Sequence, residues 1–239
     1  MKRKKKISEE EFLEQYEKHL LFLSSNDRAG ARLILRNSIL PVHWLSGKNL
    51  TQCRLFNCVF STEDPEGSEP IYCRSLSLKR SVLAGCCFMG IRFHDTDFSY
   101  MDSANSDFSY GQFWTCLFAS ASVHDCSFRN SLFHQSSVQG ATLVRCCFMK
   151  SFLNQVTFTQ ARLTESDFSG ADWDYSSGIP LWCGGGNFTA DMKLIRQYLA
   201  HLCTLSVKDS EKEEWAALRE KLLPQALKSR RSISLGLTE

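Results

Sequence analysis

A large apolar side chain recurs at every fifth position through the middle of the chain. Of the twenty positions that are five apart between Leu78 and Trp173, nineteen are apolar, and Ser103 is the exception. A second register lies two residues before the first and consists mostly of small residues, such as Cys86 and Ser106. Side-chain directions repeat every 3.6 residues in an α-helix and every two in a β-strand, so neither element explains a period of five.

This pattern requires two inward side chains in every five residues, one large and one small. A chain that turns a corner every five residues meets the requirement, and four corners close a square coil of twenty residues. Coils that stack at the inter-strand distance of about 4.8 Å bury the large side chains along one central axis. Met101 is bulky where a small residue is expected, so Met101 and Ser103 compensate for each other in volume or mark a local irregularity.

The register resembles the pentapeptide-repeat family, whose loose consensus is A(D/N)LXX. The closest local matches are the stretch Ser-Asp-Phe-Ser-Gly at 166–170 and the stretch Ala-Asp-Trp at 171–173. The resemblance is firm over residues 76–175, and it implies a mainly β fold, a right-handed quadrilateral β-helix. The segment SGIPLWCGGGN (177–187) also resembles the tail that follows the repeats in some bacterial and phage members.

Helices are expected on both sides of the solenoid, where they would cap its open ends. The chain therefore divides into an N-terminal helical cap (1–42), the repeats (43–177), and C-terminal capping helices with a tail (178–239). Ser8 and Glu11 form a capping box for the first helix, and a second short helix is expected over 27–38. Ser210 with Glu213 predicts another box, at the start of a last helix that ends near Pro224.

The register breaks between Phe60 and Leu78, which are eighteen residues apart. The intervening segment STEDPEGSEP (61–70) is rich in Pro and acidic residues, so a loop insertion is predicted at about 61–72. On a solenoid such a loop is either a functional feature or a tolerated surface excursion.

Composition narrows the class of protein. The chain has 239 residues and a net charge of +2, which gives no overall attraction to nucleic acid. Eleven cysteines, an odd number, come without an apolar leader segment, and this favours free thiols in a reducing cytoplasm. No apolar run approaches the ~20 residues of a membrane span.

Three features are candidates for a catalytic or ligand-binding role. The segment LWCGGGNF (181–188) holds a Cys beside a Gly-rich turn, which suits a nucleophile or a phosphate-binding loop. It lacks the P-loop lysine, however, and a flexible connector is the alternative. Cys126 and Cys146 would be vertical neighbours, able to form a disulfide or simply to fill space. Asp97 and Asp102 would point outward from a convex wall without a cleft. We predict no catalytic residue, cofactor or metal site.

His94, Trp114 and His134 are twenty residues apart, so the coil places them in one outward column. Tyr100 and Tyr110 would lie on neighbouring edges. An exposed Trp flanked by His is typical of a contact surface, although a ladder of stacked side chains that stabilises the wall is the alternative.

These features favour a non-catalytic interaction or scaffold module that binds an unidentified protein partner. The alternative is a DNA-mimicking, topoisomerase-binding protein similar to the quinolone-resistance branch of the family. Residues 73–175 hold nine acidic and eight basic residues, which is not duplex-like. That branch dimerises through its C-terminus, so the resemblance also implies a homodimer through the C-terminal helices.

Overall fold

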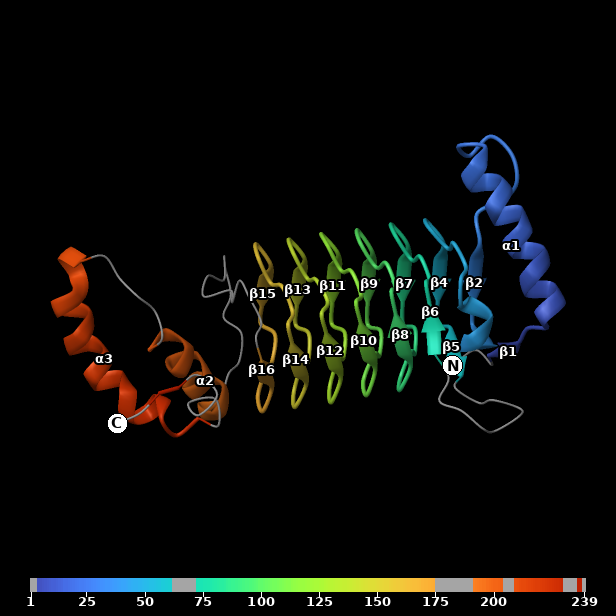
Figure 1. Ribbon diagram of the computed structural model, residues 1–239. Coiled ribbons are helices and arrows are strands. Elements are labelled where there is room, and N and C mark those ends of the chain that lie inside the picture. The colour runs from blue at the N-terminus through green and yellow to red at the C-terminus, as the bar shows by residue number, and fades with distance from the viewer. Residues whose placement is uncertain (1–3, 62–71, 175–190, 204–208, 230–235, 238–239) are drawn as a thin grey trace.

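The chain forms a rod of stacked coils with helices at both ends (Figure 1). The computed structural model describes residues 4–61, 72–174, 191–203, 209–229 and 236–237. All strand pairs in the described residues are parallel, and residues that pair in neighbouring coils of the main repeat are twenty apart, as Phe113 is from Phe93 and Phe133. The predicted β-solenoid is confirmed.

Two opposite walls of the rod are parallel sheets of three-residue strands. The first, here called the six-stranded wall, contains β6 (Tyr72–Arg74), β8 (Arg92–His94), β10 (Gln112–Trp114), β12 (Leu132–His134), β14 (Phe152–Asn154) and β16 (Asp172–Asp174). The second, the seven-stranded wall, contains β2 (Ile34–Arg36), β4 (Arg54–Phe56), β7 (Val82–Ala84), β9 (Asp102–Ala104), β11 (Ser122–His124), β13 (Thr142–Val144) and β15 (Arg162–Thr164).

The other two walls are columns of isolated parallel bridges. One column runs from Asn49 through Ser77 and Asp97 toward Thr157, and the other passes through Cys87 and Asp107. Four walls per coil confirm the quadrilateral cross-section. At the front of the second column, β1 (Lys5–Lys6), β3 (Ser38–Pro41) and β5 (Val59–Ser61) form a short third sheet.

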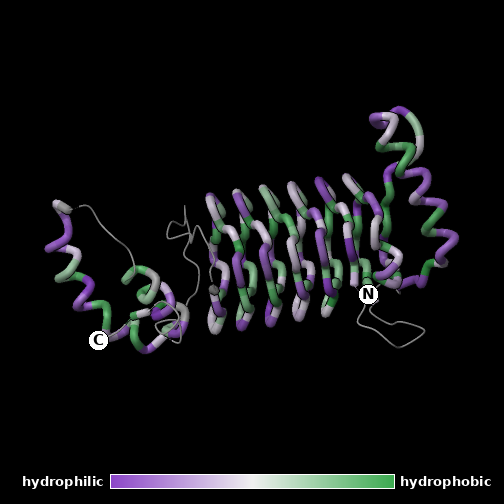
Figure 2. The backbone as a smooth tube through the Cα atoms, in the orientation of Figure 1, coloured by the Kyte–Doolittle hydropathy of each residue, from purple (hydrophilic) through white to green (hydrophobic). Residues whose placement is uncertain are grey.

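The centre of the rod is a stack of aromatic rings. Phe108 packs against Phe88 and Phe128 with ring centroids 5.0 Å apart, and Phe128 lies 4.8 Å from Phe148. All four rings are buried. Figure 2 shows hydrophobic and hydrophilic segments alternating along every coil, as two inward positions in five require.

The corners of the coil need a left-handed backbone. The residue two places after each central side chain has a positive φ; examples are Asp95, Tyr100, Asn105, Tyr110 and Thr115, with φ between 51° and 59°. L-residues adopt this conformation at a cost, and Gly at none. Some corners therefore carry Gly, as at Gly90, Gly140 and Gly170, whereas others carry larger residues in the same left-handed conformation.

The front of the rod is closed by α1 (Glu9–Ser24). Ser8 Oγ accepts a hydrogen bond from Glu11 N at 3.1 Å, so the predicted N-cap is confirmed. Phe12 is fully buried and stacks on Trp44, which belongs to the 3-10 helix η1 (Val42–Leu45). Tyr16 OH accepts a hydrogen bond from Asn49 N.

The short helix expected over 27–38 is wrong. β2 and β3 occupy 34–36 and 38–41, and Asn37 between them has the left-handed φ of a corner. Leu35 and Leu40 already follow the five-residue register, so the solenoid starts before the expected boundary at 43. The local sequence suits a helix, but pairing with β4 and β5 buries these side chains instead.

The register break is an insertion into one coil. Leu55 pairs with Leu83, twenty-eight residues away, so eight residues are added relative to the regular coil. Residues 62–71, which hold most of the predicted loop, lie outside the described residues.

At the back of the rod, α2 (Met192–Leu202) covers the last coil. Trp173 N donates to Gln197 Oε1 at 2.9 Å, and the Trp173 ring lies 5.6 Å from Tyr198. A 3-10 helix η2 (Asp209–Glu211) leads into α3 (Lys212–Ala226). The predicted capping box at Ser210 is wrong, because α3 begins after Glu211 without a side-chain cap. The helix ends at Ala226, close to Pro224 as predicted, although Pro224 lies inside its last turn.

The compensation between Ser103 and Met101 is testable, because both are fully buried. Ser103→Leu should lower the free energy of unfolding by about 1–3 kcal/mol through overpacking, and Met101→Ala by about 2–5 kcal/mol through a cavity. If the added volume fills that cavity, the double variant loses less than the sum by at least about 0.5 kcal/mol in urea denaturation. Ser103→Leu combined with Leu163→Ala is the control and should be additive. Additivity at 101 and 103 would contradict compensation.

Candidate functional site

The predicted outward column exists on the six-stranded wall. His94, Trp114 and His134 pair in register through β8, β10 and β12. The His94 and Trp114 rings are parallel within 2° with centroids 5.7 Å apart, and Trp114 lies 4.6 Å from His134. All three are half-buried. The faces of His94 and Trp114 cover each other, whereas the His134 ring is tilted by 55° against Trp114.

Sequence reasoning missed the front end of this column. The Tyr72 ring lies 5.5 Å from His94, and Arg74 pairs with His94 in the sheet. Arg92 Nη1 lies 3.3 Å from Tyr72 OH and donates to it. The signal was available, because residues 72–74 lie twenty before 92–94, but the register break hid it.

The electrostatics of the column differ from those of an acid–base site. Burial lowers the pKa of His94, and Arg74 lowers it further, while Asp95 partly opposes the shift. His94 is therefore neutral at physiological pH and behaves as an aromatic ring rather than as a cation.

A second outward column beside the first adds apolar surface. Leu132 and Phe152 occupy it on β12 and β14, and Phe152 is 36% exposed. The aromatic surface, as we call it, comprises Tyr72, His94, Trp114, Leu132, His134 and Phe152. The described strands of the seven-stranded wall carry no such ring column: their outward positions mix apolar residues such as Ile34 and Val144 with polar ones such as Ser122, Thr142 and Arg162.

The two predicted tyrosines lie at different corners. Tyr110 lies at the corner two residues before β10 and therefore flanks the aromatic surface, with 58% of its area exposed. Tyr100 precedes β9, so it borders the seven-stranded wall and is 54% exposed. Tyr110 thus lies at the edge of the wall that carries Trp114, and Tyr100 lies at the neighbouring edge, as predicted.

The outward aspartates have structural partners. Asp97 Oδ1 accepts a hydrogen bond from Ser99 N at 2.8 Å, and Asp107 Oδ1 accepts one from Ser109 N at 2.9 Å. Each carboxylate thus closes its own turn in the way common for Asp. This arrangement explains why Asp stands before the central residue on these two walls.

The inward cysteines belong to the hydrogen-bonded frame. Cys146 N donates to Ser166 Oγ at 3.0 Å, and Cys116 N donates to Ser136 Oγ at 3.0 Å, so the small inward residue of one coil satisfies the amide of the coil before. Cys126 and Cys146 are vertical neighbours as predicted, and both are free thiols. We interpret these cysteines as small side chains that fill the inward corner of the coil.

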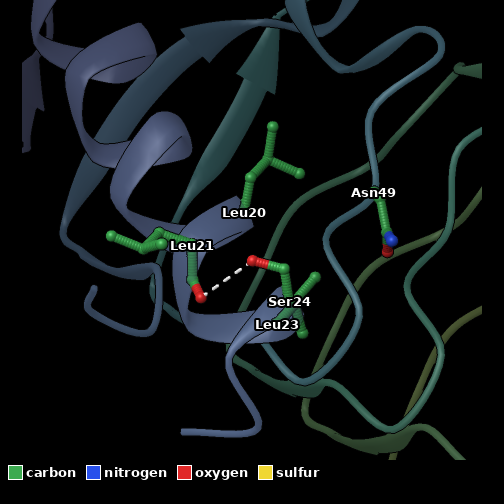
Figure 3. A pocket seen from close by; sticks show the side chains of 5 residues that line it. All are labelled: Leu20, Leu21, Leu23, Ser24 and Asn49. Carbon is green, nitrogen blue, oxygen red and sulfur yellow. Dashed lines mark hydrogen bonds between the residues drawn. The ribbon is translucent and has the colours of Figure 1, made fainter. Parts of the chain in front are cut away.

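An open hollow of about 640 Å³ lies between the C-terminal turns of α1 and the first coil (Figure 3). It is lined by Leu20, Leu21, Leu23, Ser24 and Asn49. Ser24 Oγ donates to the Leu21 carbonyl at 3.1 Å, and none of the five side chains titrates, so the lining offers no acid–base group.

The described residues offer neither a metal site nor a membrane-spanning helix. No group of three His, Cys, Asp or Glu side chains gathers there to hold a metal ion. In the same ranges, no helix has both the length and the apolar composition to cross a membrane. The Gly-rich segment 181–188 lies outside the described residues.

Comparison with known families identifies the repeat. The model described as pentapeptide repeats (8 copies) matches residues 150–172, inside the coils formed by β14, β15 and β16. The chain carries pentapeptide repeats. No curated protein matches this pentapeptide-repeat chain significantly.

Solved pentapeptide-repeat structures are distant. Full-length QnrB1, a plasmid-mediated fluoroquinolone resistance protein, is 13% identical, with 71% of this chain and 97% of that chain covered and a TM-score of 0.36. HetL from the cyanobacterium Nostoc, a pentapeptide-repeat protein involved in heterocyst differentiation regulation, is 14% identical, with 73% and 93% covered and a TM-score of 0.21. Similarities this low carry no inference about function.

The cysteines of this pentapeptide-repeat protein give a chemical test of burial. Burial raises the pKa of Cys73, Cys116 and Cys146 to about 12, so very little thiolate exists at pH 8. Iodoacetamide should leave these three unmodified in the folded protein and modify them in guanidinium, as read by peptide mass spectrometry. The half-exposed Cys147, next to Cys146, is the matched control and should react without denaturant. Equal rates at Cys146 and Cys147 would contradict the burial.

Proposed function

We propose that this pentapeptide-repeat chain is a non-catalytic interaction module that contacts a protein partner through the aromatic surface. The observation that supports this most directly is the outward column of His94, Trp114 and His134, which the Tyr72 ring contacts from the neighbouring column. The His94 and Trp114 rings are stacked, His134 is tilted against Trp114, and all four rings are half-buried. A side chain that is already ordered by its neighbours loses little entropy when a partner covers it. Trp and Tyr are also the residues that most often dominate binding energy at protein interfaces.

The shape of the wall supports the same proposal. Backbone hydrogen bonds hold β8, β10 and β12 in one sheet, so the surface is flat and preorganised. A flat wall with apolar side chains and no titratable pair suits a protein contact better than the binding of a small substrate, which usually needs a concave pocket. Dimerisation through α3 stays a prediction.

DNA mimicry is the weaker alternative. A mimic needs rows of free carboxylates, whereas Asp97 and Asp107 accept hydrogen bonds from amides in their own turns. Asp125 is paired with Arg145 at 2.6 Å. The near balance of nine acidic and eight basic residues over 73–175 also opposes it.

Trp114→Ala tests the proposal. It should lower the free energy of unfolding by only about 1 kcal/mol, because a cross-strand ring contact contributes no more than that. The amount of each partner protein captured from the native cell should fall at least tenfold, as quantified by affinity capture and mass spectrometry. Leu117→Ala removes a side chain that is 46% exposed on another wall, and it should leave capture unchanged. If Trp114→Ala and Leu117→Ala retain the same proteins, the column is only a stabilising ladder.

The two corner tyrosines separate stability from binding. Tyr110 and Tyr100 have φ of 59° and 57°, so replacing either with Gly should raise the free energy of unfolding by about 1 kcal/mol. Tyr110→Gly should also weaken capture, since Tyr110 flanks the aromatic surface, whereas Tyr100→Gly should not. Thermal denaturation and the same capture experiment measure the two effects. Equal losses of capture would place the contact elsewhere.

A further inference from the structure

The front coils carry an uneven distribution of charge. Residues 28–61 and 72–94 contain no carboxylate and nine cations, namely Arg28, Arg32, Arg36, Lys48, Arg54, Arg74, Lys79, Arg80 and Arg92. Residues 62–71, which carry four carboxylates, lie outside the described residues. The next stretch, 95–107, reverses the sign with four aspartates and no cation. Over the described coils, therefore, a basic front end adjoins a short acidic band.

Aromatic rings, not carboxylates, hold these cations. Seven of the nine lie over a ring, at distances from 4.2 Å (Arg36 over Phe56) to 5.9 Å (Lys79 over Tyr100). In the ranges that the structure covers, none of the nine takes part in an ion pair. Among the described residues, therefore, no carboxylate neutralises their charge.

Two of the guanidinium groups converge on one ring. Arg74 Cζ lies 5.1 Å and Arg92 Cζ lies 5.5 Å from the centroid of Tyr72, and Arg92 also donates to its hydroxyl. We call Tyr72, Arg74 and Arg92 the Arg–Tyr cluster. A guanidinium that is ordered on a ring keeps its N–H edge for a planar oxyanion, and its side chain is already partly immobilised.

We propose that the Arg–Tyr cluster binds an acidic segment of a polypeptide partner, with Arg74 and Arg92 as the carboxylate-binding residues. The proposal rests on the proposed function, since the cluster continues the aromatic column at its front end through the contact of Tyr72 with His94. Arg74 and Arg92 are diagonal neighbours on β6 and β8, about 7–8 Å apart at the backbone. This is close to the ~6.6 Å between alternate side chains of an extended segment. The partner thus places apolar groups on Trp114 and carboxylates on the cluster.

Nucleic acid fits these observations less well. Base recognition by stacking needs a free ring face, whereas His94 and Trp114 cover each other's faces. The acidic band at Asp95, Asp97, Asp102 and Asp107 follows within one coil, and it would repel a long phosphate backbone that ran along the rod. A short acidic peptide avoids that band.

The test uses fluorescein-labelled octaglutamate and the full chain, with fluorescence anisotropy as the readout. Wild type should bind saturably, and rising salt should weaken the binding. Arg74→Gln combined with Arg92→Gln should weaken it at least tenfold. Arg129→Gln combined with Arg162→Gln removes the same charge from exposed positions on other walls, and it should change affinity less than twofold. Circular dichroism confirms that each variant is folded, and Arg74→Lys with Arg92→Lys should restore part of the affinity.

Three results would overturn the inference. Equal weakening by both glutamine pairs would show diffuse attraction instead of a site. Tighter binding of labelled octathymidylate than of octaglutamate would assign the cluster to phosphate. Absence of octaglutamate binding with Trp114-dependent capture intact would remove this inference and leave the proposed function standing. Capture that is independent of Trp114, with octaglutamate binding intact, would remove the proposed function and leave the cluster as a carboxylate site.

Discussion

Parallel hydrogen bonding between successive coils is the constraint on which the rest of this structure depends. It repeats every twenty residues, so each side chain lies directly over the side chain twenty positions earlier. Central rings are thereby brought to stacking distance, as in Phe148 on Phe168 at 4.6 Å. The same bonds force a corner after every five residues, and the left-handed backbone at Tyr100 and Thr115 is the local cost of that path.

The register that builds the core also builds the surface. Outward side chains form columns because each residue lies over the residue twenty positions earlier. The role of a column depends on the side chains that it contains. Arg145 over Asp125 gives an ion pair that holds neighbouring coils together. The run from Tyr72 to His134 gives an ordered aromatic strip instead, and the Arg–Tyr cluster terminates that strip with positive charge. The same twenty-residue register thus produces both stabilising ladders and candidate contact surfaces, and the two differ only in the type of side chain in the column.

The fold could be predicted almost completely because its period is explicit in the sequence. The errors fell where the period was interrupted or where local signals competed with pairing. Residues 27–38 look helical in isolation, yet β2 is fixed by its partner β4. Ser210 has the spacing of a capping box, but η2 occupies that stretch and α3 begins after it. Half of the candidate site was found, since 94, 114 and 134 share a register. Tyr72 and Arg74 were missed because they lie next to the insertion, and Arg92 was missed because its partner Tyr72 was.

By itself the sequence determined the five-residue bend, the central stack and the column in which His94, Trp114 and His134 stand, because a repeating path assigns every residue a direction. Only the tertiary structure decided how Arg92 and Arg74 share the Tyr72 ring, and that Asp97 and Asp107 close their own turns. Those outcomes depend on side-chain rotamers and on the exact length of the inserted coil. A periodic pattern fixes which wall a residue faces, and it leaves the partners of long side chains open.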